Sequence, residues 1–308
     1  MIVLALLVGV ACAALGGDLF VRGVVSLAAW WRIPAGIIGA TVAAFATSSP
    51  ELSVAVNSAL QGNPQIALGD ALGSNVVNVG VVLGLALAFG AITVNRGTLA
   101  RDVPMAFAAP ALLGLLALDG NLSQADGLVL LVVFLGWLTW VAVAANSSRT
   151  AVVEVLQERS RSLTILSAAA GLALLILAGR LIVIGASGLG EQLGWDGFVV
   201  GAVFVALGTS TPEIATMLAA RFRGHDDVGV GTVLGSNIFN TLLIVGVTAA
   251  ISPITLDRAE LRLGIAVSML VVLLALPGRS GRLGRWRSLP LLATYLGTIA
   301  VLVTTAQS

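Results

Sequence analysis

Two short segments place carboxylates and hydroxyls inside runs of sequence that are otherwise almost entirely apolar. They read Ala44-Phe-Ala-Thr-Ser-Ser-Pro-Glu51 and Ala206-Leu-Gly-Thr-Ser-Thr-Pro-Glu213. An ionisable side chain at membrane depth is costly and is retained mainly for function. If the flanking runs span a bilayer, the two segments therefore predict a site for ions or for a polar substrate.

Each segment also contains a helix-breaking proline. Pro50 and Pro212 have no backbone N–H, so the carbonyls of Ala46 and Gly208 lose their helical partners, and the residue before each proline is driven away from helical geometry. We therefore expect two discontinuous helices, with the carbonyls of 44–47 and 206–209 turned into a cavity. Irregular backbone is tolerated at membrane depth only where it is buried in protein or lines water.

The polar groups in and after these segments all present oxygen. Ser74 and Asn78 are four residues apart and so share one helix face, and Ser236 and Asn240 repeat this spacing. Carboxylate, carbonyl, hydroxyl and amide oxygens are the ligands of hard cations. Calcium accepts about six to eight oxygens in flexible geometry, whereas magnesium requires a strict octahedron. The set therefore favours calcium, with carboxylates and hydroxyls from Glu51, Glu213, Thr47, Ser48, Thr209 and Ser210.

The charge of the two glutamates predicts exchange between ions. Two ionised carboxylates are neutralised by one Ca²⁺, and the neighbouring hydroxyls also suit two or three Na⁺. The charges of Glu51 and Glu213 cannot balance the calcium ion and the sodium ions at the same time. Mutual exclusion of the two ions is the physical basis of antiport, and we expect no cofactor beyond the transported ions.

Composition places the chain in a lipid bilayer. Of 308 residues 58% are hydrophobic and only 10% charged, with a mean hydropathy of +1.04, whereas soluble domains are about a quarter charged. The net charge of +1 leaves no basic surface for nucleic acid, and the absence of lysine excludes a P-loop and a lysine Schiff base. Cys12 is the single cysteine, so no intramolecular disulfide is possible. The N-terminal apolar run lacks a basic start, and we interpret it as a retained transmembrane helix.

About 20 apolar residues span a bilayer, and this length divides the chain into ten expected spans. Most arginines fall in the loops after odd-numbered spans, whereas the opposite loops hold mainly Arg258 and Arg262. The positive-inside rule therefore predicts a multi-pass plasma-membrane protein with both termini extracellular. The expected spans are 2–29, 36–60, 66–91, 102–118, 126–146, 163–187, 197–221, 227–251, 261–277 and 288–305.

An internal repeat relates the two polar segments. A shift of 162 residues aligns Gly39–Gly84 with Gly201–Gly246 without a gap. Five spans separate the copies, so the second copy must cross the membrane in the opposite direction. We expect an all-α polytopic membrane protein of ten transmembrane helices as two inverted five-helix repeats, with discontinuous helices 2 and 7 meeting at the midplane. The repeats are 1–147 (signature segment 39–84) and 163–308 (signature segment 201–246), joined by a cytoplasmic linker, 148–162.

Other polar residues within the spans are expected to have different roles. Asp70 has Thr232 at its repeat position, and we expect it at the outer mouth, with its contact to ions left open. Asn75 and Asn237 are expected to form hydrogen bonds between helices.

The repeated pattern, Thr-Ser-x-Pro-Glu followed by Gly-Ser-Asn, resembles the cation/calcium exchanger superfamily, most closely its prokaryotic sodium/calcium exchangers. The resemblance rests on the two signature segments, about a third of the chain. It implies a calcium position formed by Glu51, Glu213 and the carbonyls of Thr47 and Thr209. It implies sodium positions formed with the same glutamates by Ala44, Ser48, Ser74, Ala206, Ser210 and Ser236, and a middle position lined by Asn78 and Asn240.

The resemblance also implies a sliding motion of two helices. At some positions, however, this sequence departs from the family pattern. Spans 1 and 6 are expected to slide across the other eight, which their glycines permit. Ala46 stands where the second copy has Gly208, so the first hinge is expected to be less free. Many relatives carry an aspartate at one of the positions held here by Asn78 and Asn240, so we expect a site charge of −2 and no potassium cotransport.

These observations predict a Na⁺/Ca²⁺ antiporter that works by alternating access as a monomer and extrudes calcium. If three Na⁺ exchange for one Ca²⁺, as the family suggests, the membrane potential drives export at about 2.3 kcal/mol per charge per 100 mV. A Ca²⁺/H⁺ antiporter with the same glutamates remains an alternative. A cation channel favours a continuous pore, whereas this repeat is intramolecular and inverted. An intramembrane hydrolase needs a nucleophile with a base, and no His or Lys lies in the spans, so we expect no enzyme.

Overall fold

The computed structural model describes residues 2–30, 45, 47–94, 96–146, 161–222, 224, 226–255, 257–278 and 281–306. Predictions that involve Ala44 or Ala46 lie outside the described residues. Within these ranges the protein is helical apart from four two-residue strands, which confirms the all-α class.

In the first half of the chain, the described residues form six α-helices and one π-helical segment. Their bounds are α1 Ile2–Trp30, α3 Ser49–Leu60, α4 Pro64–Val76, η1 Val77–Leu83, α5 Gly84–Ala88, α6 Arg96–Leu116 and α7 Gln124–Asn146. The second half is more subdivided. Its helices are α8 Arg161–Leu193, α9 Gly197–Val200, η3 Gly201–Val205, α10 Ala206–Thr209, α11 Thr211–Phe222, α12 Asp226–Ile238, η4 Phe239–Ile244, α13 Val245–Ile251, α14 Arg258–Leu274, η5 Arg285–Arg287 and α15 Ser288–Thr305.

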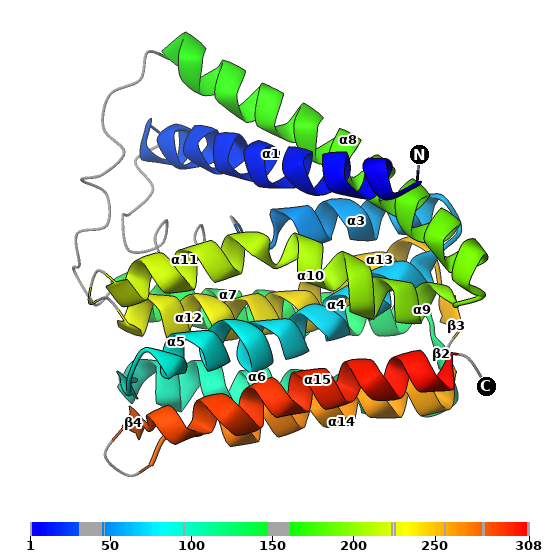
Figure 1. Cartoon of the computed structure of the whole chain (residues 1–308). Helices are drawn as coiled ribbons and strands as arrows, with labels where there is room; N and C mark the ends of the chain where they lie inside the picture. The colour runs from blue at the N-terminus through cyan, green and yellow to red at the C-terminus, as the bar shows by residue number, and fades with distance from the viewer. Residues whose placement is uncertain are drawn as a thin grey trace.

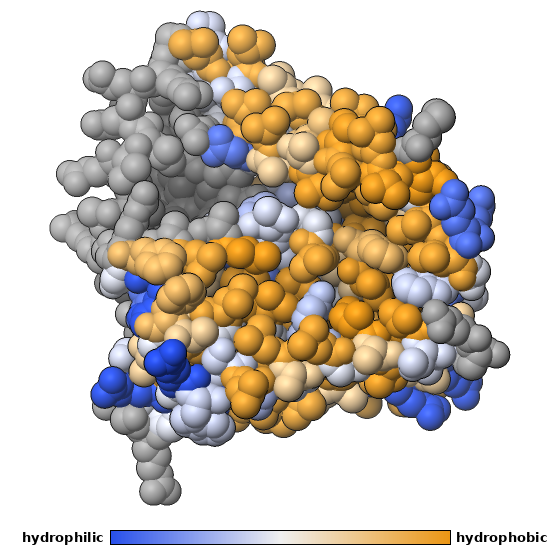
Figure 2. Space-filling model, in the orientation of Figure 1, coloured by the Kyte–Doolittle hydropathy of each residue, from blue (hydrophilic) through white to orange (hydrophobic). Residues whose placement is uncertain are grey.

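Seven helices in the described residues are long and apolar enough to cross a membrane. An eighth span results if the bent pair Gly197–Thr209 and Thr211–Phe222 counts as one. Two of the ten expected spans are not among these: 36–60 lies partly outside the described residues, and α14, which matches 261–277, has 17 residues. Figure 2 shows a broad apolar surface over the helices, with hydrophilic residues gathered toward the two ends of the molecule.

Two apolar spans, one in each half of the chain, form the core of the bundle. In the windows Pro64–Ala88 and Gly229–Ile251, 78% of the residues are buried, compared with 17% in the window that holds α15. The buried pair carries the residues that follow each proline segment. The polar side chains of the signature segments are therefore held in the most enclosed part of the protein.

Helices α1 and α8 lie side by side along one face of the bundle (Figure 1). Glycines bring them close: a Cβ on Gly171 would lie 2.3 Å from the backbone nitrogen of Phe20, and one on Gly16 would lie 2.8 Å from Leu174 Cβ. The Ser53 hydroxyl on α3 donates to the Leu175 carbonyl, which ties α8 to the first signature segment. These two helices are the ones for which the sequence predicts sliding.

Close backbone packing also joins the two halves at α4. A Cβ on Gly69 would lie 2.0 Å from the Phe198 carbonyl oxygen, and a Cβ on Gly73 would lie 2.6 Å from Ala202 Cα. Only glycine allows this approach of α4 to α9 and η3. The repeat equivalent of Gly69 is Gly231, where a Cβ would meet no described residue within 4 Å.

Two short antiparallel sheets cap the bundle at opposite ends (Figure 1). Strand β1 (Ile92–Thr93) pairs with β4 (Arg282–Leu283), and β2 (Asn121–Leu122) pairs with β3 (Ile254–Thr255). A shift of 162 residues carries β1 onto β3. The second sheet lies at the end where both termini are found.

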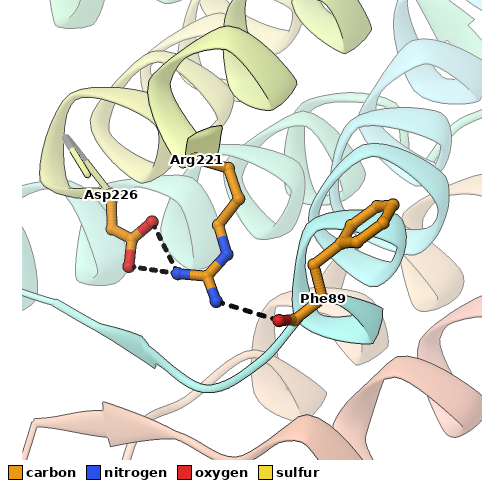
Figure 3. A network of polar contacts seen from close by, with 3 residues as sticks. All are labelled: Phe89, Arg221 and Asp226. Atoms are coloured by element: carbon orange, nitrogen blue, oxygen red, sulfur yellow. Dashed lines mark hydrogen bonds and ion pairs between the residues drawn. The ribbon is translucent and has the colours of Figure 1, made fainter. Parts of the chain in front are cut away.

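A polar contact fixes the turn between α11 and α12 (Figure 3). Arg221 donates to both carboxylate oxygens of Asp226 at 3.0 and 2.8 Å, and to the Phe89 carbonyl at 3.3 Å. The rings of Phe89 and Phe222 pack edge to face, 5.2 Å apart. The end of α5 and the end of α11 are thereby joined.

Candidate cation-binding site

The helix break in each signature segment falls at a serine. Ser48 precedes α3 with φ −89° and ψ 8°, and Ser210 separates α10 from α11 with φ −77° and ψ 5°. The second break bends the helix axis by 42°. The prediction that the residues before the prolines leave helical geometry is wrong, because Ser49 and Thr211 begin α3 and α11. Each proline instead lies in the first turn of its helix, where the missing N–H would be unpaired anyway.

The carbonyls at the second break are satisfied within the protein. The Thr211 hydroxyl donates to the Gly208 carbonyl at 2.8 Å, and the Ala206 carbonyl accepts from the Ser210 N–H at 3.1 Å. The expectation that proline frees these carbonyls into a cavity is therefore wrong for Ala206 and Gly208. A threonine hydroxyl replaces the amide donor that Pro212 lacks. A carbonyl oxygen has two lone pairs, so the Ala206 oxygen retains capacity for a cation.

Both signature glutamates are fully buried. Glu51 is 0% exposed and Glu213 1%. The Ser236 hydroxyl donates to Glu213 Oε1 at 3.1 Å, whereas Glu213 Oε2 and both oxygens of Glu51 have no hydrogen-bond partner. The two carboxylates also lie close enough to repel each other electrostatically. Buried carboxylates without partners are strongly unfavourable unless a positive charge joins them.

The hydroxyls of the site form two pairs that cross between the halves of the chain. The Thr47 and Ser236 oxygens are 3.1 Å apart, and the Ser74 and Thr209 oxygens are 3.5 Å apart. Each pair joins a residue of one proline segment to a residue of the other half's following helix. The structure thus brings together the threonines and serines that the sequence assigns to one site.

Ser48 and Ser210 lie at the breaks themselves. Both are fully buried, and neither hydroxyl has a hydrogen-bond partner. A buried hydroxyl without a partner is costly in an apolar environment. These two oxygens are therefore open to a ligand.

The asparagines divide into two kinds. Asn75 donates to the Thr241 hydroxyl at 2.8 Å and Asn237 donates to the Asn75 carbonyl at 3.1 Å, which confirms the predicted hydrogen bonds between helices. Asn240 has no partner for either amide atom. Asn78 donates to Asn237 at 3.1 Å, and its oxygen is unpartnered. Asn78 and Asn240 are the second residues of the π-helical segments η1 and η4. Such segments are frequent at functional sites.

Asp70 is a member of this cluster that the sequence placed elsewhere. It is 0% exposed, which contradicts the expected position at the outer mouth. The Thr209 hydroxyl donates to Asp70 Oδ1 at 2.9 Å, and the Ser74 hydroxyl lies 3.4 Å from the same oxygen. The spacing of four residues between Asp70 and Ser74 was the available signal in the sequence.

Unpartnered oxygens are concentrated at this site. In a folded protein about 90% or more of buried polar atoms are paired. Among the described residues, 14 buried side-chain atoms have no partner, and nine belong to the site. These are one atom each on Ser48, Asp70, Asn78, Ser210 and Glu213, and two each on Glu51 and Asn240.

The donor set fits hard cations rather than a tight acidic metal cage. In the part of the chain that the structure describes, no three His, Cys, Asp or Glu side chains converge on one point. The remaining ligands must be hydroxyl, amide and carbonyl oxygens, which calcium and sodium accept and zinc does not prefer.

The family of the chain follows from comparison with known proteins. The family model described as "Sodium/calcium exchanger protein" matches residues 1–143 and 163–304. The chain is 32% identical over 275 residues to the inner membrane protein YrbG of Escherichia coli, covering 86% of this chain and 85% of that protein. It is also 32% identical over 303 residues to the putative antiporter CaxA of Alkalimonas amylolytica, covering 94% and 95%. The chain belongs to the sodium/calcium exchanger family.

A solved structure of the same family has the same fold. The sodium-calcium exchanger NCX_Mj, soaked with 2.5 mM Na⁺ and 10 mM Sr²⁺, aligns with a TM-score of 0.66 at 29% identity. The alignment covers 97% of this exchanger and 99% of that chain. The protein is thus a multi-pass membrane antiporter of the cation/calcium exchanger type, and Na⁺ and Ca²⁺ are the ions that its family transports as substrates.

Proposed function

We propose that this exchanger couples the entry of Na⁺ to the export of Ca²⁺ across the plasma membrane by alternating access. The observation that carries the proposal is the concentration of buried, unpartnered oxygens around Glu51 and Glu213. The same oxygens can bind either ion, so Na⁺ and Ca²⁺ compete for the site. If three Na⁺ exchange for one Ca²⁺, one net charge moves in each cycle and the membrane potential assists export.

We assign the ions to residues as follows. Calcium binds between Glu51 and Glu213 with the carbonyls of Thr47 and Thr209. Asn78 and Asn240 line the middle position. Sodium binds around them with oxygens from Ala44, Ser48, Ser74, Ala206, Ser210 and Ser236. The burial of Ser48, Ser74, Ser210 and Ser236, each at 0% exposed, supports this arrangement, because a hydroxyl so placed has few other partners.

The same proposal includes ten spans in two inverted repeats, 1–147 and 163–308, joined by 148–162. The equivalence of β1 and β3 under the 162-residue shift supports it, because their sheets lie at opposite ends of the molecule (Figure 1). Both termini lie at one end, as an even number of spans requires. The arginine distribution places that end outside the cell. We propose that one chain suffices for transport.

Calcium flux into sodium-loaded vesicles tests the coupling. Purified exchanger is reconstituted in proteoliposomes loaded with Na⁺ and diluted into sodium-free buffer that contains ⁴⁵Ca²⁺. Uptake is expected only with an outward sodium gradient, and it should increase when the vesicle interior is made positive, because net positive charge leaves with sodium. Uptake that ignores sodium but follows an imposed pH gradient would instead establish the Ca²⁺/H⁺ alternative.

A further inference from the structure

Asp70 is a buried carboxylate on only one side of the repeated site. It lies in α4, one helical turn before Ser74, and its repeat equivalent is Thr232. Its Oδ1 accepts from Thr209 at 2.9 Å and lies 3.4 Å from the Ser74 hydroxyl, while its Oδ2 is buried without a partner. Neither of the two ion pairs found among the described side chains involves Asp70. Its charge is therefore uncompensated by any described arginine.

The oxygens around Asp70 form a donor set of their own. The Ser74 and Thr209 hydroxyls are 3.5 Å apart, and Thr209 in turn contacts the carbonyls of Val205 at 3.2 Å and Ala206 at 3.4 Å. These groups come from α4, η3 and α10, which pack closely through Gly73. One carboxylate with neutral oxygens carries a single negative charge, which suits a hard monovalent cation.

The Asp70 set is distinct from the position between the glutamates. No three acidic side chains converge on one point among the described residues, so Asp70 does not share a single ion with both Glu51 and Glu213. Asp70 lies at the centre of α4, one turn closer than Ser74 to the N-terminal end of that helix. That end faces strand β3, because the Gln65 amide donates to the Thr255 carbonyl at 3.3 Å. From Ser74 to Asp70, α4 therefore runs toward the end of the molecule that carries both termini (Figure 1).

We propose that Asp70 is an additional acidic ligand of the sodium position that includes Ser74, and that the hydroxyls of Ser74 and Thr209 hold its carboxylate there. This inference rests on the proposed sodium/calcium exchange. It also changes the expected charge of the site, because an ionised Asp70 adds a third carboxylate to the two glutamates. Three Na⁺ balance three carboxylates, whereas one Ca²⁺ does not. Asp70 thereby favours the sodium-loaded form over the calcium-loaded form.

Equilibrium binding of ²²Na⁺ and ⁴⁵Ca²⁺ to the purified exchanger tests this without requiring transport. Asp70→Asn keeps an oxygen that accepts from Thr209 but removes the charge, and Asp70→Thr copies the residue of the second repeat. For each variant, the sodium concentration for half-saturation is expected to rise about tenfold, the loss typical of one charged ligand. The calcium concentration for half-saturation in sodium-free buffer is expected to rise less than about threefold on the same reasoning.

A matched control separates a ligand from a distant charge. Asp257→Asn makes the same change at an exposed helix cap of α14 and is expected to alter neither ion. A distant charge acts twice as strongly on a divalent as on a monovalent ion. A calcium effect equal to or larger than the sodium effect in the Asp70 variants would therefore overturn the inference, as would unchanged binding of both ions.

Binding and flux together separate this inference from the proposed function. Loss of sodium affinity in the Asp70 variants supports the Asp70 position whatever the flux assay shows. A wild-type exchanger that binds both ions but shows no sodium-driven calcium flux would reject the proposed coupling alone. Sodium-driven flux in the wild type with unchanged sodium binding in both Asp70 variants would reject the Asp70 position alone.

Discussion

The two halves of the site share one motif but distribute their hydrogen bonds differently. In the second half, Ser236 donates to Glu213. Around the first half's glutamate, the hydroxyls of Ser74 and of Thr209 from the second half are directed to Asp70 instead, and both carboxylate oxygens of Glu51 lack a hydrogen-bond partner. Asp70 stands where the second half has Thr232, and it accepts the hydrogen bond from Thr209. A sequence repeat therefore predicts equivalent positions without predicting equivalent chemistry.

Neutralising the glutamates is expected to have the largest effect and to expose this asymmetry. Glu51→Gln and Glu213→Gln each remove one of two charges beside calcium, an attraction of about 4 kcal/mol at 4 Å near a protein surface. Calcium flux should fall more than about a hundredfold in each variant. Calcium flux at the wild-type rate in either variant would reject the proposed calcium position.

The same two variants should differ in stability when sodium and calcium are absent. Because neither carboxylate oxygen of Glu51 has a partner at hydrogen-bond geometry, its replacement by Gln relieves more unfavourable charge than the replacement of Glu213, which accepts from Ser236. The melting temperature is therefore expected to rise more in Glu51→Gln. Differential scanning fluorimetry in chelator-treated, sodium-free buffer measures this. Equal shifts would show that the hydrogen bond to Glu213 has no energetic weight.

Glycine packing gives a second matched pair. Gly69→Ala would place a Cβ 2.0 Å from the Phe198 carbonyl oxygen, whereas the Cβ of Gly231→Ala would meet no described residue within 4 Å. Overpacking costs about 1–3 kcal/mol, and alanine in an open helix position is favoured over glycine by up to about 1 kcal/mol. Gly69→Ala is expected to lower the melting temperature and Gly231→Ala to leave it unchanged or raise it. Equal effects would contradict the unequal packing of α4 and α12.

Glu260, at the end of the molecule that carries the termini, is expected to make the stability of the protein depend on pH. Glu260 lies before the apolar part of α14, in a pocket of about 150 Å³ that it shares with Asp196 and Asp257. Partial burial, the hydrogen bond with Asp196 and the nearby charges raise the pKa of Glu260 from 4.5 to about 8. The folded state then binds a proton that the unfolded state has released, so this contribution to stability is present below pH 4.5 and is lost as pH rises to about 8.

Glu260→Gln tests this directly. The variant is expected to melt at a higher temperature than the wild type at pH 8 and to show a flatter profile between pH 5 and 8. Glu191→Gln makes the same change at an exposed position and should leave the profile unaltered. The repeat equivalent of Glu260 is Thr98, so no matching titration is expected from that position. A wild-type profile that is flat over this range would contradict the raised pKa.

The smallest effect is expected at the turn between α11 and α12. Arg221 and Asp226 have side chains 18% and 20% exposed, and ion pairs near the surface contribute about 0.2–1 kcal/mol. The first repeat has Ala59 and Pro64 at these positions, so it cannot form this pair. A double-mutant cycle with Arg221→Gln and Asp226→Asn should give a coupling energy in that range. A coupling indistinguishable from zero would show that the Phe89 carbonyl is the contact of Arg221 that matters.

Most residues of the candidate site could be singled out from the sequence because their signals are local. An acidic residue behind a proline in an apolar run stands out, and helical spacing places Ser74 with Asn78. The fate of the freed carbonyls could not be predicted, since it depends on the rotamer of Thr211, whose hydroxyl reaches Gly208. The break at Ser48 and Ser210, rather than one residue later, reflects the tolerance of a helix's first turn for proline.

The sequence by itself determined the membrane class, the repeat and the identity of the glutamates, because each depends on composition or on spacing along one chain. Only the tertiary structure decided the contacts of Asp70, whose partner Thr209 is 139 residues away. Helical periodicity shows which residues share a face, but not which other helix that face meets. That choice is made by close packing, here by the glycines of α4 against η3 and α9, and it turns an isolated aspartate into part of the site.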